Sequence, residues 1–188
     1  METVPWQKIL DKWDAYQLAA NKTAVYPKES LVYPVLGLVG EAGEFMMCLT
    51  SGSPQELIKE AGDILWYCAE ICTSRGVKLS DCWRRPDGPT PNRFNALINA
   101  SRLAEAYKKA IRSGAQAPDL TTTIRIIGDV ILAVDRVLEA LELPTIPEIM
   151  EINIEKLAAR ALAGTLKERG NRPPNPPYID PKHGQQRG

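Results

Sequence analysis

Apolar side chains recur every three or four residues along most of the chain, a pattern typical of amphipathic helices. Clear start and stop signals divide this pattern. Ser53-Pro54-Gln55-Glu56 and Thr145-Ile146-Pro147-Glu148 are capping-box starts, and Gly76 and Pro144 are stops. Helices are expected over about 5–21, 30–49, 54–75, 93–113, 121–143 and 145–169. Because no segment has the pattern of a strand, the sequence predicts an all-α antiparallel helical bundle.

Two of the expected helices carry pairs of acids three residues apart, Glu41 with Glu44 and Glu60 with Asp63. Residues at this spacing lie on nearly the same helix face. The link at 50–52 is short, so the two helices should fold back as an antiparallel hairpin with the acid pairs facing each other. Four crowded carboxylates repel one another, and oxygen ligands of this kind suit Mg²⁺ or Mn²⁺.

The alternative is that these acids lie on solvated helix faces, as most glutamates do. Two features favour a site. Both pairs adjoin strongly apolar residues, and Gly40, Gly43 and Gly62 each stand directly before one of the acids inside a helical pattern. Glycine in a helix costs about 1 kcal/mol relative to alanine, and it often permits the close approach of a backbone or a ligand.

Four elements together resemble the MazG-like all-α nucleoside triphosphate pyrophosphohydrolases: Tyr16-Gln17, the ExxE of residues 41–44, the ExxD of residues 60–63, and Asn153-x-x-Lys156. The resemblance covers most of residues 6–75 and 145–165. It implies a four-helix assembly that binds Mg²⁺, for which Mn²⁺ can substitute, and splits a (d)NTP into the (d)NMP and pyrophosphate. The family often has a further glutamate where this chain has Gly40, so two or more ions are possible and their number stays open. The family is generally dimeric or tetrameric, which implies a homodimer or homotetramer.

The resemblance also implies roles for particular residues. Glu41, Glu44, Glu60 and Asp63 would be the metal ligands, with Glu41 or Glu44 the catalytic acceptor of a proton from the water that attacks the α-phosphorus. Asn153, Lys156 and Arg160 lie on one stripe of the last helix and would bind the substrate phosphates. The base-binding candidates are Trp13, Tyr16, Gln17 and Lys28, and guanine is the base we prefer.

Other functions share much of this pattern. Phosphoribosyl-ATP pyrophosphohydrolase and an all-α dUTPase use similar acids. A helical module that binds a nucleotide and a metal without hydrolysing the nucleotide is an alternative from a different class.

Composition limits these choices further. The chain has 188 residues, 44% of them hydrophobic, and 23 acidic residues balance 23 basic ones. It therefore has no overall charge that would attract nucleic acid or a membrane, and we expect nucleotide binding to be local. No apolar run approaches the length of about 20 residues that spans a bilayer, so we expect a cytoplasmic protein.

Histidine and cysteine usage excludes further classes. The single histidine, His183, argues against histidine-metal hydrolases and Ser-His or Cys-His nucleophiles. The four cysteines form no CxxC pair and are expected to be buried free thiols. One domain over residues 1–170 is expected, followed by an extended Pro/Gly-rich tail over 171–188.

The second half of the chain can be aligned with the first half. Residues 103–106 match 42–45 and residues 127–130 match 61–64, which places Arg102 where Glu41 stands and Ile126 where Glu60 stands. One hypothesis is two related helical hairpins, of which only the first can hold a metal. The alternative is an ordinary insertion of two amphipathic helices.

Overall fold

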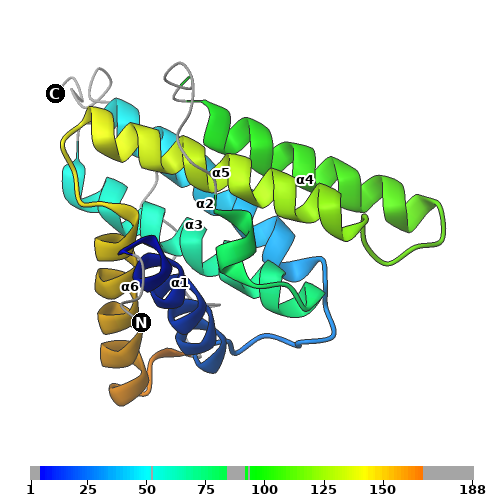
Figure 1. Cartoon of the computed structure of the whole chain (residues 1–188), viewed down its shortest axis with the longest axis horizontal. Coiled ribbons are helices and arrows are strands. Elements are labelled where there is room, and N and C mark those ends of the chain that lie inside the picture. The colour runs from blue at the N-terminus through cyan, green and yellow to red at the C-terminus, as the bar shows by residue number, and fades with distance from the viewer. Residues whose placement is uncertain (1–4, 52, 84–91, 93, 167–188) are drawn as a thin grey trace, which may run out of the picture.

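The computed structural model describes residues 5–51, 53–83, 92 and 94–166, and the regular elements in this part of the chain are all helices (Figure 1). The elements are α1 (Pro5–Lys22), α2 (Tyr33–Ser51), α3 (Pro54–Arg75), the short 3₁₀-helix η1 (Leu79–Cys82), α4 (Asn95–Arg112), α5 (Leu120–Ala140) and α6 (Ile146–Leu162). This confirms the all-α prediction. The tail expected over 171–188 lies outside the described residues.

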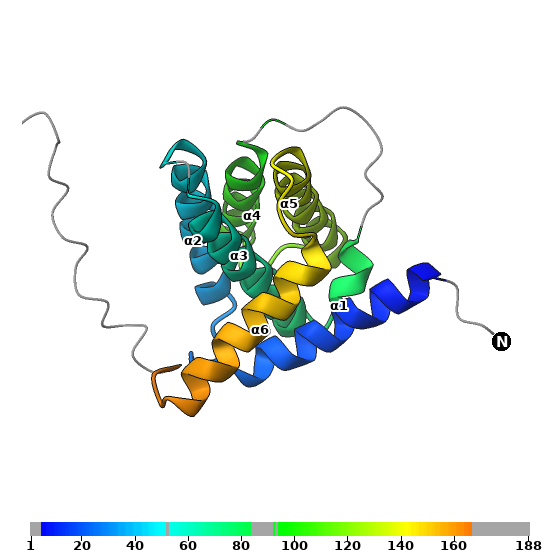
Figure 2. The same ribbon diagram turned by 90° about the vertical axis from the view of Figure 1, so that its left-hand side faces the viewer.

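Two helical hairpins form the centre of the molecule. Helices α2 and α3 pack together as the first hairpin, α4 and α5 as the second, and the two meet through contacts of α2 with α4 and of α3 with α5. Helices α1 and α6 lie side by side and cover α3 on the opposite side (Figure 2). The second hairpin therefore covers the first within a single chain. Whether the two hairpins are related stays a hypothesis.

Helix α3 is the central helix. It contacts α1, α2, α5 and α6, and every residue from Glu60 to Cys72 is buried. A helix that is buried on all sides is normally apolar all round. This one nevertheless carries Glu60, Asp63 and Glu70, which are 3%, 1% and 1% exposed. Acidic residues are almost never fully buried without a partner or a ligand, so these three need a local explanation.

Several boundaries follow the sequence signals. Ser53 accepts a hydrogen bond from the Glu56 amide at the start of α3, and Gly76 ends that helix in the left-handed region at φ 66°. The capping box of Thr145 and Glu148 starts α6. Helix α2 begins at Tyr33 instead of residue 30, which places Pro34 in the first turn, where its missing amide costs no hydrogen bond.

Two helices end earlier than the sequence indicates. Helix α5 ends at Ala140 and not at Leu143, because the amide of Leu143 bonds to the Leu138 carbonyl at 2.9 Å and closes the helix while Glu142 adopts a positive φ of 54°. Helix α6 ends at Leu162, well before residue 169. Gly164 has φ 71° there, and the Thr165 amide bonds to the Arg160 carbonyl in the same kind of closure.

The cysteines of the described residues are free thiols, as expected. Cys68, Cys72 and Cys82 are buried and Cys48 is partly buried. In the part of the chain that the structure describes, no helix has both the length and the apolar character needed to cross a membrane.

Candidate metal centre

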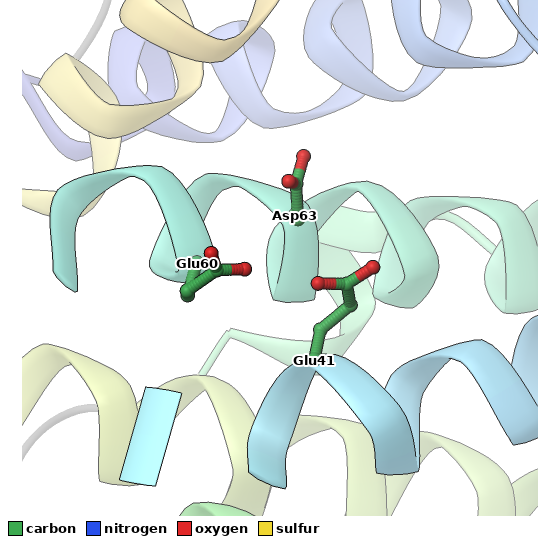
Figure 3. Close-up of side chains that lie close together, drawn as sticks. All are labelled: Glu41, Glu60 and Asp63. Carbon is green, nitrogen blue, oxygen red and sulfur yellow. The ribbon is translucent and has the colours of Figure 1, made fainter. Parts of the chain in front are cut away.

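Three of the four acids singled out in the sequence meet between α2 and α3. Oxygen atoms of Glu41, Glu60 and Asp63 all lie within 4.8 Å of one another (Figure 3). Glu60 and Asp63 come from the buried stretch of α3, and Glu41 reaches them from α2. The antiparallel hairpin brings the middle of one helix beside the first half of the other.

Glu44 lies outside this cluster. It is exposed, whereas Ala42 and Phe45 beside it fill the core. Positions 41 and 44 differ by about 60° around the helix axis. That rotation turns Glu44 away from the buried side, so the structure brings together three of the predicted ligands and leaves the fourth at the surface.

The cluster contains acceptor atoms that the protein does not satisfy. Among the described residues, Glu41 Oε2 and Glu60 Oε2 are buried and have no hydrogen-bond partner. A buried polar atom without a partner costs about 1–3 kcal/mol, and more when the group is charged. A bound cation would satisfy these oxygens, and an all-carboxylate donor set fits a hard divalent ion.

The same crowding changes the protonation of Glu41. Burial raises the pKa of this carboxyl from its ordinary 4.5, and the carboxylates of Asp63, Glu60 and Glu44 add to the effect and bring it to about 8. Without a cation, Glu41 is therefore protonated at neutral pH. A divalent ion would reverse this preference and release the proton.

Two lysines partly balance the cluster. Lys156 Nζ lies 2.6 Å from Asp63 Oδ1, and Lys59 forms an ion pair with Glu60. Their side chains are 21% and 34% exposed, so each ammonium group stands at the edge of the site. Three carboxylates against two ammonium groups leave a negative balance when all three are ionised.

Helix α6 delivers Asn153 and Lys156 to the cluster from a distant part of the sequence. Asn153 is 1% exposed, and its Nδ2 donates to Asp63 Oδ1 at 3.3 Å. Gly62 makes this possible, since a Cβ there would lie only 2.8 Å from Asn153 Nδ2. The close approach expected at the glycines therefore occurs at Gly62. At Gly40 and Gly43 an added Cβ would meet nothing within 4 Å.

Tyr16 of α1 completes this buried network. Its hydroxyl donates to Asn153 Oδ1 at 3.0 Å and lies 3.5 Å from the Gly62 carbonyl oxygen. Burial, followed by the charge of Asp63, raises the pKa of Tyr16 well above its usual value, so the hydroxyl stays a donor. The hydrogen bonds from Tyr16 to Asn153 and from Asn153 to Asp63 together fix the orientation of the Asp63 carboxylate.

The other predicted substrate residues lie elsewhere. Arg160 is half-buried near the end of α6, and its carbonyl accepts from Thr165. Trp13 is 3% exposed and part of the core. Gln17 bonds to Thr73 Oγ1, to the Val77 carbonyl and to the Leu79 amide, and so ties α1 to the segment after α3. Lys28 is exposed and donates to Asn21.

Sequence reasoning missed Glu70, the third buried acid of α3. Its Oε2 accepts from the Tyr26 hydroxyl at 2.8 Å, and both of its oxygens lie 3.3 Å from Asn21 Nδ2. Tyr26 in turn stacks on Tyr33, with ring centroids 4.6 Å apart. The signal was present, because Glu70 follows Asp63 by seven residues, two helical turns along the same face. Lys59 was also missed, although it directly precedes Glu60.

The fold and the site together define an all-helical protein with a buried carboxylate cluster inside a helical hairpin. The chain is 36% identical over 90 residues to the Gene 37 protein of Mycobacterium phage L5, an alignment that covers 38% of this chain and 79% of the phage protein. The chain belongs to the same family as that phage protein. The name of the relative states no activity. No protein-family model matches the chain, and no solved structure matches it.

Proposed function

We propose that this protein is a MazG-like pyrophosphohydrolase that hydrolyses a (d)NTP to the (d)NMP and pyrophosphate, with (d)GTP the preferred substrate and Mg²⁺ or Mn²⁺ the cofactor. One observation carries the proposal. The acids of two separate motifs, Glu41 and the Glu60–Asp63 pair, meet with unsatisfied buried oxygens, and Asn153 and Lys156 of the third motif reach the same point.

The local charges suit a triphosphate held through a cation. Glu41, Glu60 and Asp63 would hold the ion. Glu44, three residues after Glu41 on the same helix, would become a further ligand only if its side chain turned inward. When bound, a divalent ion neutralises phosphate charge and lowers the pKa of water. Without the cation, Lys59 and Lys156 are already paired with Glu60 and Asp63, so the cluster offers a triphosphate little net positive charge and substrate binding should require the ion.

The chain's own residues supply positioning and proton transfer. Lys156 is partly exposed and can extend from Asp63 towards a phosphate at the edge of the site, while Asn153 keeps Asp63 in place. Glu41 lies within the cluster and would be ionised once a cation is bound, whereas Glu44 is exposed outside it. This favours Glu41 over Glu44 as the proton acceptor.

The test is pyrophosphate release from a panel of ribo- and deoxyribonucleoside triphosphates plus dUTP, with Mg²⁺, with Mn²⁺ and with EDTA. We expect release with either metal, none with EDTA, and none from Glu60→Gln. Glu56→Gln is the matched control, because it makes the same charge change on an exposed residue of the same helix. Full activity in Glu60→Gln would overturn the proposal.

If no nucleotide of the panel is hydrolysed, calorimetry with Mn²⁺ measures whether the carboxylate cluster binds a metal. One outcome is that Mn²⁺ binds to wild type and not to Glu60→Gln while no nucleotide is hydrolysed. That result would favour a helical module that binds metal and nucleotide without hydrolysis, or phosphoribosyl-ATP as the substrate. Absence of Mn²⁺ binding would overturn the metal centre itself.

We also propose a homodimer or homotetramer. Helix α2 exposes Leu36 and Met47 at 63% and 71%, and a second copy could cover these apolar side chains. The alternative is a monomer, because the second hairpin already covers the first within one chain. Light scattering of the purified protein measures the mass directly. A monomer at all concentrations would contradict this assignment.

A further inference from the structure

The second hairpin has a groove of its own. It is a shallow, open groove of about 700 Å³ lined by residues of α4 and α5. These two helices lie away from α1 and α6 (Figure 1). The volume of the groove falls within the range of small-molecule sites, which is about 300–1,000 Å³. Its apolar lining includes the buried Ile126 together with Leu97 and the exposed Ile98.

The rim of this groove is cationic. Arg102, Lys109 and Arg125 line it, together with one acid, Glu105. Glu105 forms ion pairs with Lys108, which is not among the lining residues, and with Lys109 at 3.6 Å, so Lys109 would have to be shared between this acid and a ligand. The hydroxyl-bearing residues Ser101 and Thr122 lie on the same walls. In a chain whose formal net charge is zero, this is a local concentration of positive charge.

A contact within the protein orients each of the two arginine side chains, and each guanidinium group still has N–H donors for a ligand. Arg102 Nη1 donates to Asn99 Oδ1 at 3.1 Å, and Arg125 Nη1 forms an ion pair with Asp129 Oδ2 at 3.5 Å, which offsets part of its charge. A guanidinium group has five N–H donors in a planar fork, and these contacts use one nitrogen of each. The remaining donors suit the oxygens of a phosphate.

The location of the groove adds a second argument. When the second hairpin is laid on the first, Arg102, Glu105 and Ile126 correspond to Glu41, Glu44 and Glu60. All three corresponding residues line the groove. In this alignment a cation and an apolar residue replace two of the acids. Such a replacement would favour an anion over a cation.

We infer that the α4–α5 groove binds a phosphorylated small molecule, with its phosphates on Arg102, Arg125 and Lys109 and its ring or other apolar part on the apolar lining beside Ile126. This site is separate from the carboxylate cluster and needs no metal. It does not depend on the proposed hydrolase function, since it uses none of Glu41, Glu60 and Asp63.

Calorimetry of the full chain in EDTA tests this inference, because EDTA removes any contribution of a metal at the carboxylate cluster. The probes are inorganic pyrophosphate and GMP. We expect both to bind, GMP more tightly because its ring covers the apolar lining. Equal affinities would assign the binding to phosphate alone. If neither probe binds, the inference is wrong.

Variants then locate the binding. Arg102→Gln and Arg125→Gln should each weaken binding about tenfold or more, the effect of losing a charged hydrogen bond. Arg112→Gln is the matched control, because it removes the same charge from an exposed position near the end of α4 outside the groove. An equal loss in Arg112→Gln would show that only overall charge matters and would overturn the site.

A further variant and an NMR measurement distinguish loss of the binding site from unfolding of the protein. Ser101→Glu places a negative charge on an exposed wall residue without disturbing the core, and it should abolish binding. In NMR titrations the amides of Ser101, Thr122 and Ile126 should shift while those of Glu41 and Asp63 stay constant. Shifts confined to the carboxylate cluster would contradict the inference.

Discussion

Gly62 lies directly against the side chain of Asn153. A Cβ atom on residue 62 would stand 2.8 Å from Asn153 Nδ2 and 3.1 Å from its Cβ, closer than such atoms normally approach. The missing side chain lets α6 dock on α3 at the level of the acid cluster. As a result Asn153 can bond to Asp63, the residue that directly follows Gly62.

Gly62→Ala should therefore destabilise the protein. Overpacking of a tight contact costs about 1–3 kcal/mol, which exceeds the gain of about 1 kcal/mol from replacing glycine by alanine in a helix. We expect the free energy of unfolding to fall by about 1 kcal/mol in urea denaturation. Mn²⁺ affinity should fall as well, because Asn153 can no longer hold Asp63.

Gly43→Ala is the matched control. A Cβ at this position meets nothing within 4 Å, so the variant should gain stability by up to about 1 kcal/mol from helix propensity alone. Equal effects of the two substitutions would show that contact with α6 is not what requires glycine at position 62.

The stability of the metal-free protein should depend on pH through Glu41. Its pKa in the folded state is about 8, above the ordinary 4.5. Between these values the folded chain holds a proton that the unfolded chain has lost, so stability falls as pH rises from about 4.5 to about 8. The slope from this one group is at most about 1.4 kcal/mol per pH unit.

Urea denaturation of wild type and Glu41→Gln at several pH values isolates this contribution. The variant should lose the downward slope and be the more stable of the two at pH 8. Added Mn²⁺ should stabilise wild type increasingly as pH rises, because the metal binds the ionised carboxylates. Parallel pH profiles for the two proteins would rule out a raised pKa at Glu41.

Lys156→Met should be strongly destabilising in the absence of metal. Lys156 is the charged partner of Asp63, whose side chain is 1% exposed. Removing one member of a buried pair typically costs 3–5 kcal/mol, and we expect a value of about 3 kcal/mol because Lys156 is itself partly exposed. Chemical denaturation measures this loss.

The exposed ion pair of Lys12 with Glu151 provides the comparison for Lys156→Met. Both of its side chains are more than half exposed, so Lys12→Met should cost about 1 kcal/mol or less. Similar costs for the two lysines would mean that Asp63 is not a buried carboxylate dependent on its ion pair.

The second hairpin should not contribute to metal binding. Asp129 is the counterpart of Asp63, but it faces Arg125, and Arg102 and Ile126 replace two of the other acids. Asp63→Asn should therefore weaken Mn²⁺ binding strongly, whereas Asp129→Asn should leave it unchanged in calorimetry. An equal loss in both variants would refute the idea that only the first hairpin is competent for metal.

Much of the secondary structure was predictable because its signals are local. The starts at Ser53 and Thr145 and the stop at Gly76 each depend on a few neighbouring residues, and each occurs where the sequence indicates. The ends of α5 and α6 were placed too late. Helix closure at Leu143 and Thr165 depends on the backbone conformation of Glu142 and Gly164, which the apolar pattern does not report.

The sequence by itself determined that the chain is helical and that acids stand in pairs on two adjacent helices. Only the tertiary structure decided which acids meet. The rotation of α2 in its packed position turns Glu41 inward and Glu44 outward, and Asn153 arrives from 90 residues away at Asp63. Helix propensity and caps act over a few residues, whereas the composition of the site depends on how packed helices rotate against one another.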